Sequence, residues 1–86
     1  RQMTKEEKTI DICGVLVHAT KGKEEEIKEN INTIDGVNVH YITKTNRLII
    51  TIEKDEKGQI MDIIDGFNEV PGVISTILTY QHSEPV

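Results

Sequence analysis

The chain has 86 residues, of which 36% are hydrophobic and 29% charged, and its formal net charge is −5. This length allows one domain with one small core, and it excludes an enzyme whose active-site cleft lies between two domains. The excess of acidic residues disfavours the phosphate backbone of a nucleic acid as a partner and suits a cationic partner.

The single cysteine, Cys13, excludes an internal disulfide and any zinc site built on paired thiolates. No apolar run approaches the roughly 18 residues of a membrane span, and the N-terminus does not resemble an export signal. We therefore expect a cytoplasmic protein that does not insert into a membrane. Arg1 and Gln2 precede Met3, which is a candidate for the native start.

The first part of the chain predicts a strand and a helix behind a flexible N-terminal tail at residues 1–9. Residues 10–19 are almost continuously apolar, which is typical of a central strand. Residues 22–34 predict an amphipathic helix, and Gly36 follows it as a left-handed stop. The apolar positions at helical spacing are Ile27, Ile31 and Ile34.

Two further strands and a short turn follow. Residues 37–43 alternate between apolar and polar, and residues 47–53 are strongly apolar, so both predict strands. Residues 44–46 connect them as a hairpin, in which Asn46 accepts a positive φ.

The last part of the chain predicts a second helix and a fourth strand. Asp55 is a plausible N-cap, residues 71–72 (Pro-Gly) end the helix, residues 73–80 form the strand, and residues 81–86 form a C-terminal tail. The apolar positions of this helix are Ile60, Ile63, Ile64 and Phe67.

The resulting order, β-α-β-β-α-β, contains an internal repeat, because Gly36-Val37 and its neighbours match Gly72-Val73 and its neighbours 36 positions later. Two such halves predict an α+β, ferredoxin-like split βαβ fold, with a four-stranded antiparallel sheet and two helices on one face. We expect one domain at residues 10–80, with the strands 10–19 and 47–53 in the centre of the sheet.

Side-chain alternation along the strands predicts which residues face the helices. The predicted core residues of the first three strands are Cys13, Val15, Val17, Ala19, Val37, Val39, Tyr41, Leu48, Ile50 and Ile52. The facing of strand 73–80 stays undecided, because its two alternating sets are about equally apolar and a β-bulge would exchange them.

The opposite face of the sheet has no predicted cover. Its residues are Ile12, Gly14, Leu16, His18, Asn38, His40, Ile42, Ile49, Thr51 and Glu53. Clustered aliphatic side chains with a charged rim are typical of a partner surface. A second subunit or a folded-back tail would cover such a face equally well.

The sequence lacks the constellations that carry catalysis or hold a metal. His18 and His40 have no metal-ligand spacing, and Cys13 is best interpreted as a small buried hydrophobe. No arginine occurs in the loop at 20–23, which disfavours acylphosphatase chemistry, and the central strands lack the aromatics of an RNA-binding sheet. We expect no catalytic residues, no metal and no cofactor.

Three segments resemble the NapD family of small cytoplasmic chaperones that assist the assembly of periplasmic nitrate reductase. They are residues 12–19 (ICGVLVHA), residues 46–53 (NRLIITIE) and residues 70–82 (VPGVISTILTYQH). The resemblance spans about residues 10–83. It implies a ferredoxin-like fold that binds the twin-arginine signal peptide of the catalytic subunit, NapA, and delays export until the cofactor is inserted. It also implies that the peptide lies on the sheet face away from the helices.

The candidate peptide-binding residues are Ile12, Gly14, Leu16, His18, His40, Ile49, Thr51 and Glu53. Our hypothesis is that Ile12, Leu16 and Ile49 contact the apolar turns of a peptide helix, while carboxylates such as Glu53 meet the arginines. Strand addition along the edge 37–43 or 73–80 is the competing geometry. A small-molecule-sensing or oligomerising regulatory domain and a structural adaptor stay open as alternative functions, as does a homo-oligomer.

Overall fold

The computed structural model describes residues 9–55 and 57–85, which form four strands and two helices in the order β-α-β-β-α-β. The elements are β1 (Thr9–Ala19), α1 (Glu24–Ile31), β2 (Val37–Ile42), β3 (Arg47–Lys54), α2 (Lys57–Phe67) and β4 (Val73–Pro85). The strands form one sheet in the order β2-β3-β1-β4, and every neighbouring pair is antiparallel. The ferredoxin-like α+β fold and the two predicted central strands are therefore confirmed.

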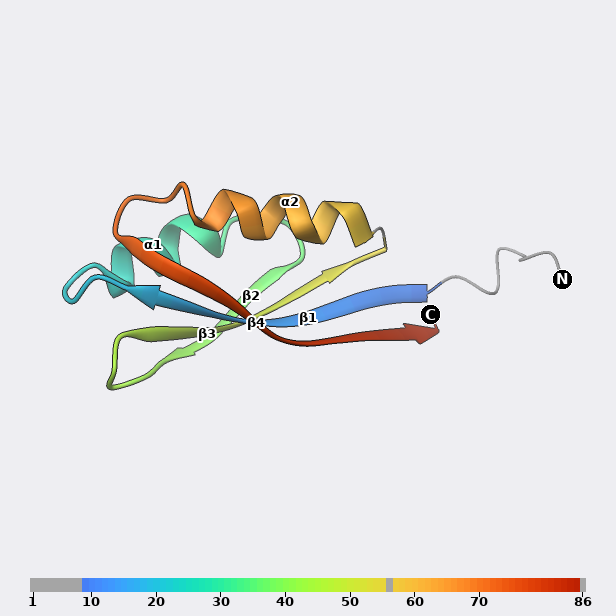
Figure 1. Ribbon diagram of the computed structural model, residues 1–86, viewed down its shortest axis with the longest axis horizontal. Helices are drawn as coiled ribbons and strands as arrows, with labels where there is room; N and C mark the ends of the chain where they lie inside the picture. The colour runs from blue at the N-terminus through green and yellow to red at the C-terminus, as the bar shows by residue number, and fades with distance from the viewer. Residues whose placement is uncertain (1–8, 56, 86) are drawn as a thin grey trace, which may run out of the picture.

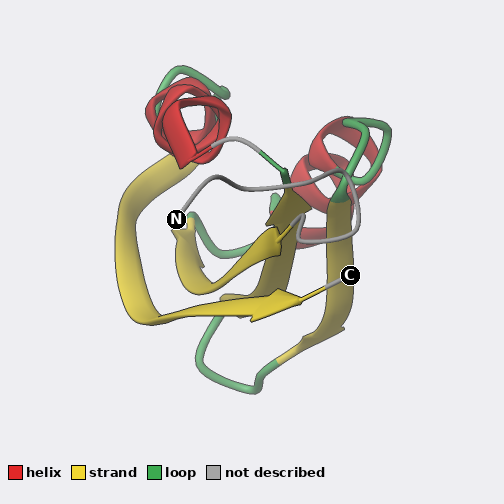
Figure 2. Ribbon diagram, turned by 90° about the vertical axis from the view of Figure 1, so that its right-hand side faces the viewer, coloured by secondary structure: helices red, strands yellow, loops and turns green. Residues whose placement is uncertain are grey.

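Both helices lie on the same face of the sheet, as Figure 1 and Figure 2 show from two directions. Neither helix covers the opposite face, which we call the open face. In the part of the chain that the structure describes, no helix is long and apolar enough to cross a membrane.

The core between sheet and helices is aliphatic except for one phenylalanine and one cysteine. It contains the predicted residues of β1 and β3 together with the apolar sides of both helices. Its buried members are Cys13, Val15, Val17, Ala19, Ile27, Ile31, Val37, Leu48, Ile50, Ile52, Ile60, Ile64 and Phe67. No polar or charged residue is buried among residues 9–55 and 58–85.

The internal repeat is visible in how each helix returns to the sheet. After α1 the backbone N–H groups of Ile34 and Val37 donate to the carbonyls three residues before them, each at 3.1 Å. Val70 and Val73 repeat this pattern after α2, also at 3.1 Å. In each turn a glycine takes a positive φ, 86° at Gly36 and 95° at Gly72. The first helix therefore ends at Ile31, and Ile34 packs against the core from the turn.

Strand β4 is longer than the sequence predicts. β4 continues to Pro85, and residues 81–85 pair with residues 9–13 of β1. The described part of the predicted C-terminal tail is therefore strand, because its backbone groups satisfy those of β1. The predicted N-terminal tail lies outside the described residues except for Thr9. The N-cap predicted at Asp55 involves residue 56, which also lies outside them.

A β-bulge in β2 makes two predicted facings wrong. Val39 pairs with Ile50, but Tyr41 pairs with Ile49, so His40 is an extra residue. The extra residue turns the rest of the strand over. Tyr41, predicted in the core, is 59% exposed on the open face, while Ile42, predicted outward, packs against the core.

Two irregularities in β4 decide the facing that the sequence left open. The register to β1 shifts between Gly14 and Val15, where Thr79 is extra, and between His18 and Ala19, where Ile74 is extra. The direct partners of the outward residues of β1 lie on the same face of the sheet. Ser75, Ile77, Tyr80 and His82 therefore belong to the open face.

Candidate functional site

The open face consists of four rows that run across the strands, each built from directly paired residues. The first row contains Glu53, Ile12 and His82, and the second contains Asn38, Thr51, Gly14 and Tyr80. The third row contains Tyr41, Ile49, Leu16 and Ile77, and the fourth contains Arg47, His18 and Ser75. The face is thus polar at both ends and apolar in its middle.

The third row and Tyr80 of the second row form the apolar centre of this face. Ile77 and Tyr80 are 55% and 51% exposed, and Leu16 and Ile49 are half-buried beside them. A hollow of about 290 Å³ lies here, and most of its lining is apolar. Its lining residues are Gly14, Val15, Leu16, Ile49, Ile50, Thr51, Thr79 and Tyr80.

The hollow depends on Gly14, because the Tyr80 ring lies directly over this glycine. A Cβ atom at Gly14 would overlap the Tyr80 ring and would lie 2.7 Å from Oγ1 of Thr79. A glycine within a strand typically marks such a close approach. Gly14 therefore contributes to this face mainly by leaving room for the Tyr80 ring, since a glycine itself adds little contact area.

Hydrogen bonds fix the polar side of the hollow. Nε2 of His40 lies 2.7 Å from Oγ1 of Thr51, so the extra residue of the β2 bulge reaches over the open face. In the first row, Nε2 of His82 lies 3.3 Å from a carboxylate oxygen of Glu84. Within the described residues no group of three or more His, Cys, Asp or Glu side chains could hold a metal ion.

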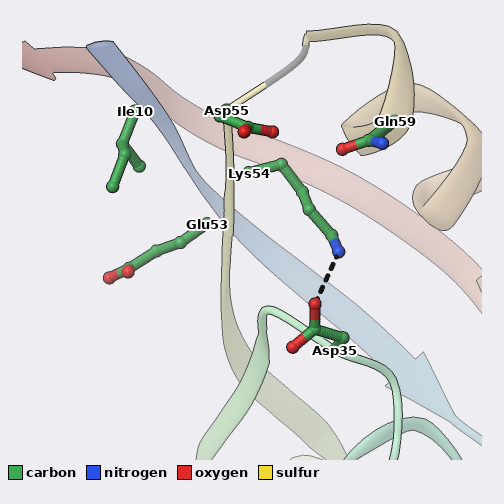
Figure 3. Close-up of a pocket in the computed structure, with 6 residues that line it drawn as sticks. All are labelled: Ile10, Asp35, Glu53, Lys54, Asp55 and Gln59. Atoms are coloured by element: carbon green, nitrogen blue, oxygen red, sulfur yellow. Dashed lines mark hydrogen bonds and ion pairs between the residues drawn. The ribbon is translucent and has the colours of Figure 1, made fainter. Parts of the chain in front are cut away.

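A pocket of about 420 Å³ with three carboxylates in its lining lies at the Glu53 end of the sheet, where it also reaches Gln59 of α2. The pocket is shown in Figure 3, and its residues are Ile10, Asp35, Glu53, Lys54, Asp55 and Gln59. Lys54 is already paired, with its Nζ 3.2 Å from Oδ2 of Asp35. In Figure 3 the Glu53 side chain points away from this ion pair, on the side of Ile10. Glu53 therefore presents an exposed carboxylate that the lysine does not neutralise.

The other end of the face is basic. Arg47 pairs with His18 in the fourth row, and its Nη1 donates to the carbonyl oxygen of Thr45 at 2.9 Å. Lys44 lies in the turn before it. No carboxylate within 4.0 Å of this guanidinium is present among the described residues.

Near the basic end, Glu24 joins α1 to the turn between β2 and β3. Its carboxylate accepts hydrogen bonds from the backbone N–H of Gly22 and, at 2.5 Å, from Nδ2 of Asn46. The hydrogen bond at its own backbone, followed by that from Asn46, holds the pKa of Glu24 below its ordinary value. Asn46 has the positive φ that the sequence predicts, 65°.

The structure brings the eight candidate residues together on one face. The outward set of β1 and of β3 lies as predicted, and His40 reaches the same face from its bulge. Three exposed large hydrophobic residues of this face were not among the candidates predicted from the sequence: Tyr41, Ile77 and Tyr80. Gly14 was the available signal, because a glycine in a central strand indicates that a large side chain lies across it.

Comparisons with known proteins agree with this fold. The chain matches a solved structure described as the solution structure of the E. coli Tat proofreading chaperone protein NapD, with a TM-score of 0.78 and 22% identity. The match covers 87% of this chain and 80% of that chain. The comparison with curated proteins gives no match.

A family model described as NapD protein matches residues 10–85, which include all four strands and both helices. The family is one of chaperones, which gives this chain a chaperone role and not an enzymatic one. Because the match extends over nearly the whole sequence, the chain belongs to the NapD family.

Proposed function

We propose that this chaperone acts in the cytoplasm by binding the twin-arginine signal peptide of NapA, the catalytic subunit of periplasmic nitrate reductase. Binding delays export of the precursor until its cofactor has been inserted. The observation that carries the proposal is the open face, where exposed apolar side chains such as Ile77 and Tyr80 lie on the same surface as the exposed carboxylate of Glu53.

The chemistry of a twin-arginine leader matches this surface in two parts. Its apolar segment would remove the middle rows from water, which is the main favourable contribution to such an interface. Its arginines would form charge-assisted hydrogen bonds with carboxylates such as Glu53. The net charge of −5 attracts a cationic peptide over a longer range.

The irregular edges of the sheet support docking on the face rather than strand addition. β2 and β4 are the edge strands, and both contain β-bulges, at His40 in the first and at Ile74 and Thr79 in the second. Bulges interrupt the row of free backbone groups that an added strand needs. The face, by contrast, offers a continuous set of apolar side chains for a helical peptide.

Calorimetric titration of the full chain with a synthetic NapA leader tests the proposal. We expect saturable binding to this leader and weaker binding to leaders of unrelated exported proteins. A leader in which both arginines are replaced by glutamine should also bind more weakly. Absence of binding at hundreds of micromolar, with the protein folded, would contradict the proposal and direct attention to a regulatory domain.

Two matched variants locate the binding surface. Ile77→Gln changes an apolar residue of the open face, while Met61→Gln changes a residue of α2 with similar exposure, 49% against 55%. Burial of an isoleucine contributes about 1.5–3 kcal/mol, so Ile77→Gln should weaken binding about tenfold or more. Met61→Gln should leave affinity unchanged. Equal effects of the two variants would place the peptide elsewhere.

A further inference from the structure

The open face carries charges of opposite sign at its two ends. At one end of this face lie the carboxylates of Glu53 and Glu84, since these residues pair directly with Ile12 and Ile10 of β1. Asp35 and Asp55 line the neighbouring pocket at the same end of the sheet, together with Lys54, which is paired with Asp35. At the other end of the same strands lie Arg47 and, in the turn before it, Lys44. The charges therefore distinguish the two ends of the face along β1 and β3, which the apolar centre alone does not do.

The distance between the two charged ends suits the length of a leader peptide. Glu53 and Arg47 lie at opposite ends of β3, six positions apart, which corresponds to about 20 Å of strand at roughly 3.4 Å per residue. A helix rises 1.5 Å per residue, so about 13 residues of a helical peptide span the same distance. The arginines of a leader and the apolar segment that follows them would fit within this length.

We propose that the peptide binds in one direction, with its arginine pair at the Glu53 end and its apolar segment running along β1 toward Arg47. This inference rests on the proposed function and adds the orientation of the ligand to it. Carboxylates at the first row attract the basic head, and the middle rows accept the apolar residues that come after it.

Arg47 determines the orientation by repulsion. In the reversed direction the arginines of the peptide would face its guanidinium, which has no carboxylate within 4.0 Å among the described residues. Juxtaposed like charges are unfavourable, and such repulsive elements commonly decide between competing binding modes. Arg47 is thus a positioning residue for this peptide, and Glu53 is its attractive counterpart.

Paramagnetic labelling of the peptide tests the orientation directly. Two versions of a synthetic NapA leader carry a nitroxide through a thioether, one at the N-terminal side of the arginines and one at the C-terminal end of the apolar segment. Each is added to the full chain labelled with nitrogen-15. We expect the N-terminal label to broaden the amide signals of Ile12 and Glu53, and the C-terminal label to broaden those of His18 and Arg47.

The possible results separate the orientation from the proposed function. Exchange of the two broadening patterns, or the same pattern from both labels, would overturn the orientation while leaving peptide binding intact. Broadening confined to the helices would overturn both the face and the orientation. Complete absence of spectral change at millimolar peptide would refute the proposed function, and the orientation with it.

Charge variants give an independent readout. Glu53→Lys should weaken binding about fivefold, as expected for an exposed ion pair, whereas Glu29→Lys on α1 changes the net charge equally and should have almost no effect. Arg47→Glu should allow both directions, so that each label broadens signals at both ends of the face. A single unchanged direction in Arg47→Glu would remove Arg47 from the proposal.

Discussion

Gly14 shows how one residue without a side chain determines a surface. It lies in the central strand β1, and the Tyr80 ring occupies the space that a Cβ atom would need. Any larger residue must move Tyr80 away from the sheet and change the hollow that both residues line.

We predict that Gly14→Ala destabilises the fold by about 1–3 kcal/mol, because overpacking forces neighbouring side chains out of place. Gly66→Ala is the matched control in α2, where a Cβ atom meets nothing within 4 Å. It should stabilise the helix by about 0.5–1 kcal/mol. Urea unfolding measures both changes, and the cost of Gly14→Ala should shrink when Tyr80 is also replaced by alanine.

Glu24 makes part of the stability dependent on pH. Its pKa is lower in the folded chain than in the unfolded chain, so its contribution is present above the unfolded pKa and is lost as the pH falls through the folded pKa. We predict that Glu24→Gln lowers the free energy of unfolding at neutral pH and that the difference from the wild type disappears in acid. Asn46→Gly, which keeps the positive φ, should show a smaller effect of the same sign. A difference that persists in acid would contradict this account.

At the scale of an element, the bulge in β2 decides which of two neighbouring residues supports the core. An unbroken alternation would bury Tyr41 and expose Ile42, whereas the observed register does the reverse. The bulge also places His40 over the face, where it contacts Thr51.

The register with the bulge in β2 and the register without it predict opposite results for a pair of alanine variants. We expect Ile42→Ala to cost about 1–3 kcal/mol of unfolding free energy, because it removes partly buried methyl groups from the core. Tyr41→Ala should cost less than about 1 kcal/mol, as is usual for exposed positions. Urea unfolding of both proteins measures this, and the reverse ranking would mean that β2 has no bulge in solution.

At the scale of the whole molecule, the repeat and the charge distribution act together. Two similar halves place both helices on one side of the sheet, so that neither helix covers the other side (Figure 2). The acidic end and the basic end then lie at opposite ends of the same uncovered surface.

We predict that the affinity for a twin-arginine leader falls several-fold between about 0.05 and 0.5 M salt, because salt screens exposed charges beyond a few ångströms. A leader with glutamines in place of both arginines should show little dependence on salt, since only its apolar contacts remain. Calorimetry at several salt concentrations measures both, and equal slopes for the two peptides would exclude the carboxylates from binding.

The sequence by itself determined the element order, the central strands, the aliphatic core of β1 and β3, and the outward sets of those two strands. Hydrophobic periodicity and turn residues are local, and unbroken pairing between β1 and β3 preserves the alternation that they predict. Asn46 and the repeated glycines likewise specify their turns through their own backbone preferences.

Only the tertiary structure decided which side chains of the edge strands β2 and β4 face the core and how far β4 extends. The facing of Tyr41, Ile42, Ile77 and Tyr80 depends on extra residues whose positions are fixed by the partner strand. One inserted residue moves every following side chain to the other face, so a local pattern does not reveal it. The extension of β4 to Pro85 has the same origin, because polar residues become strand there only where β1 offers backbone partners.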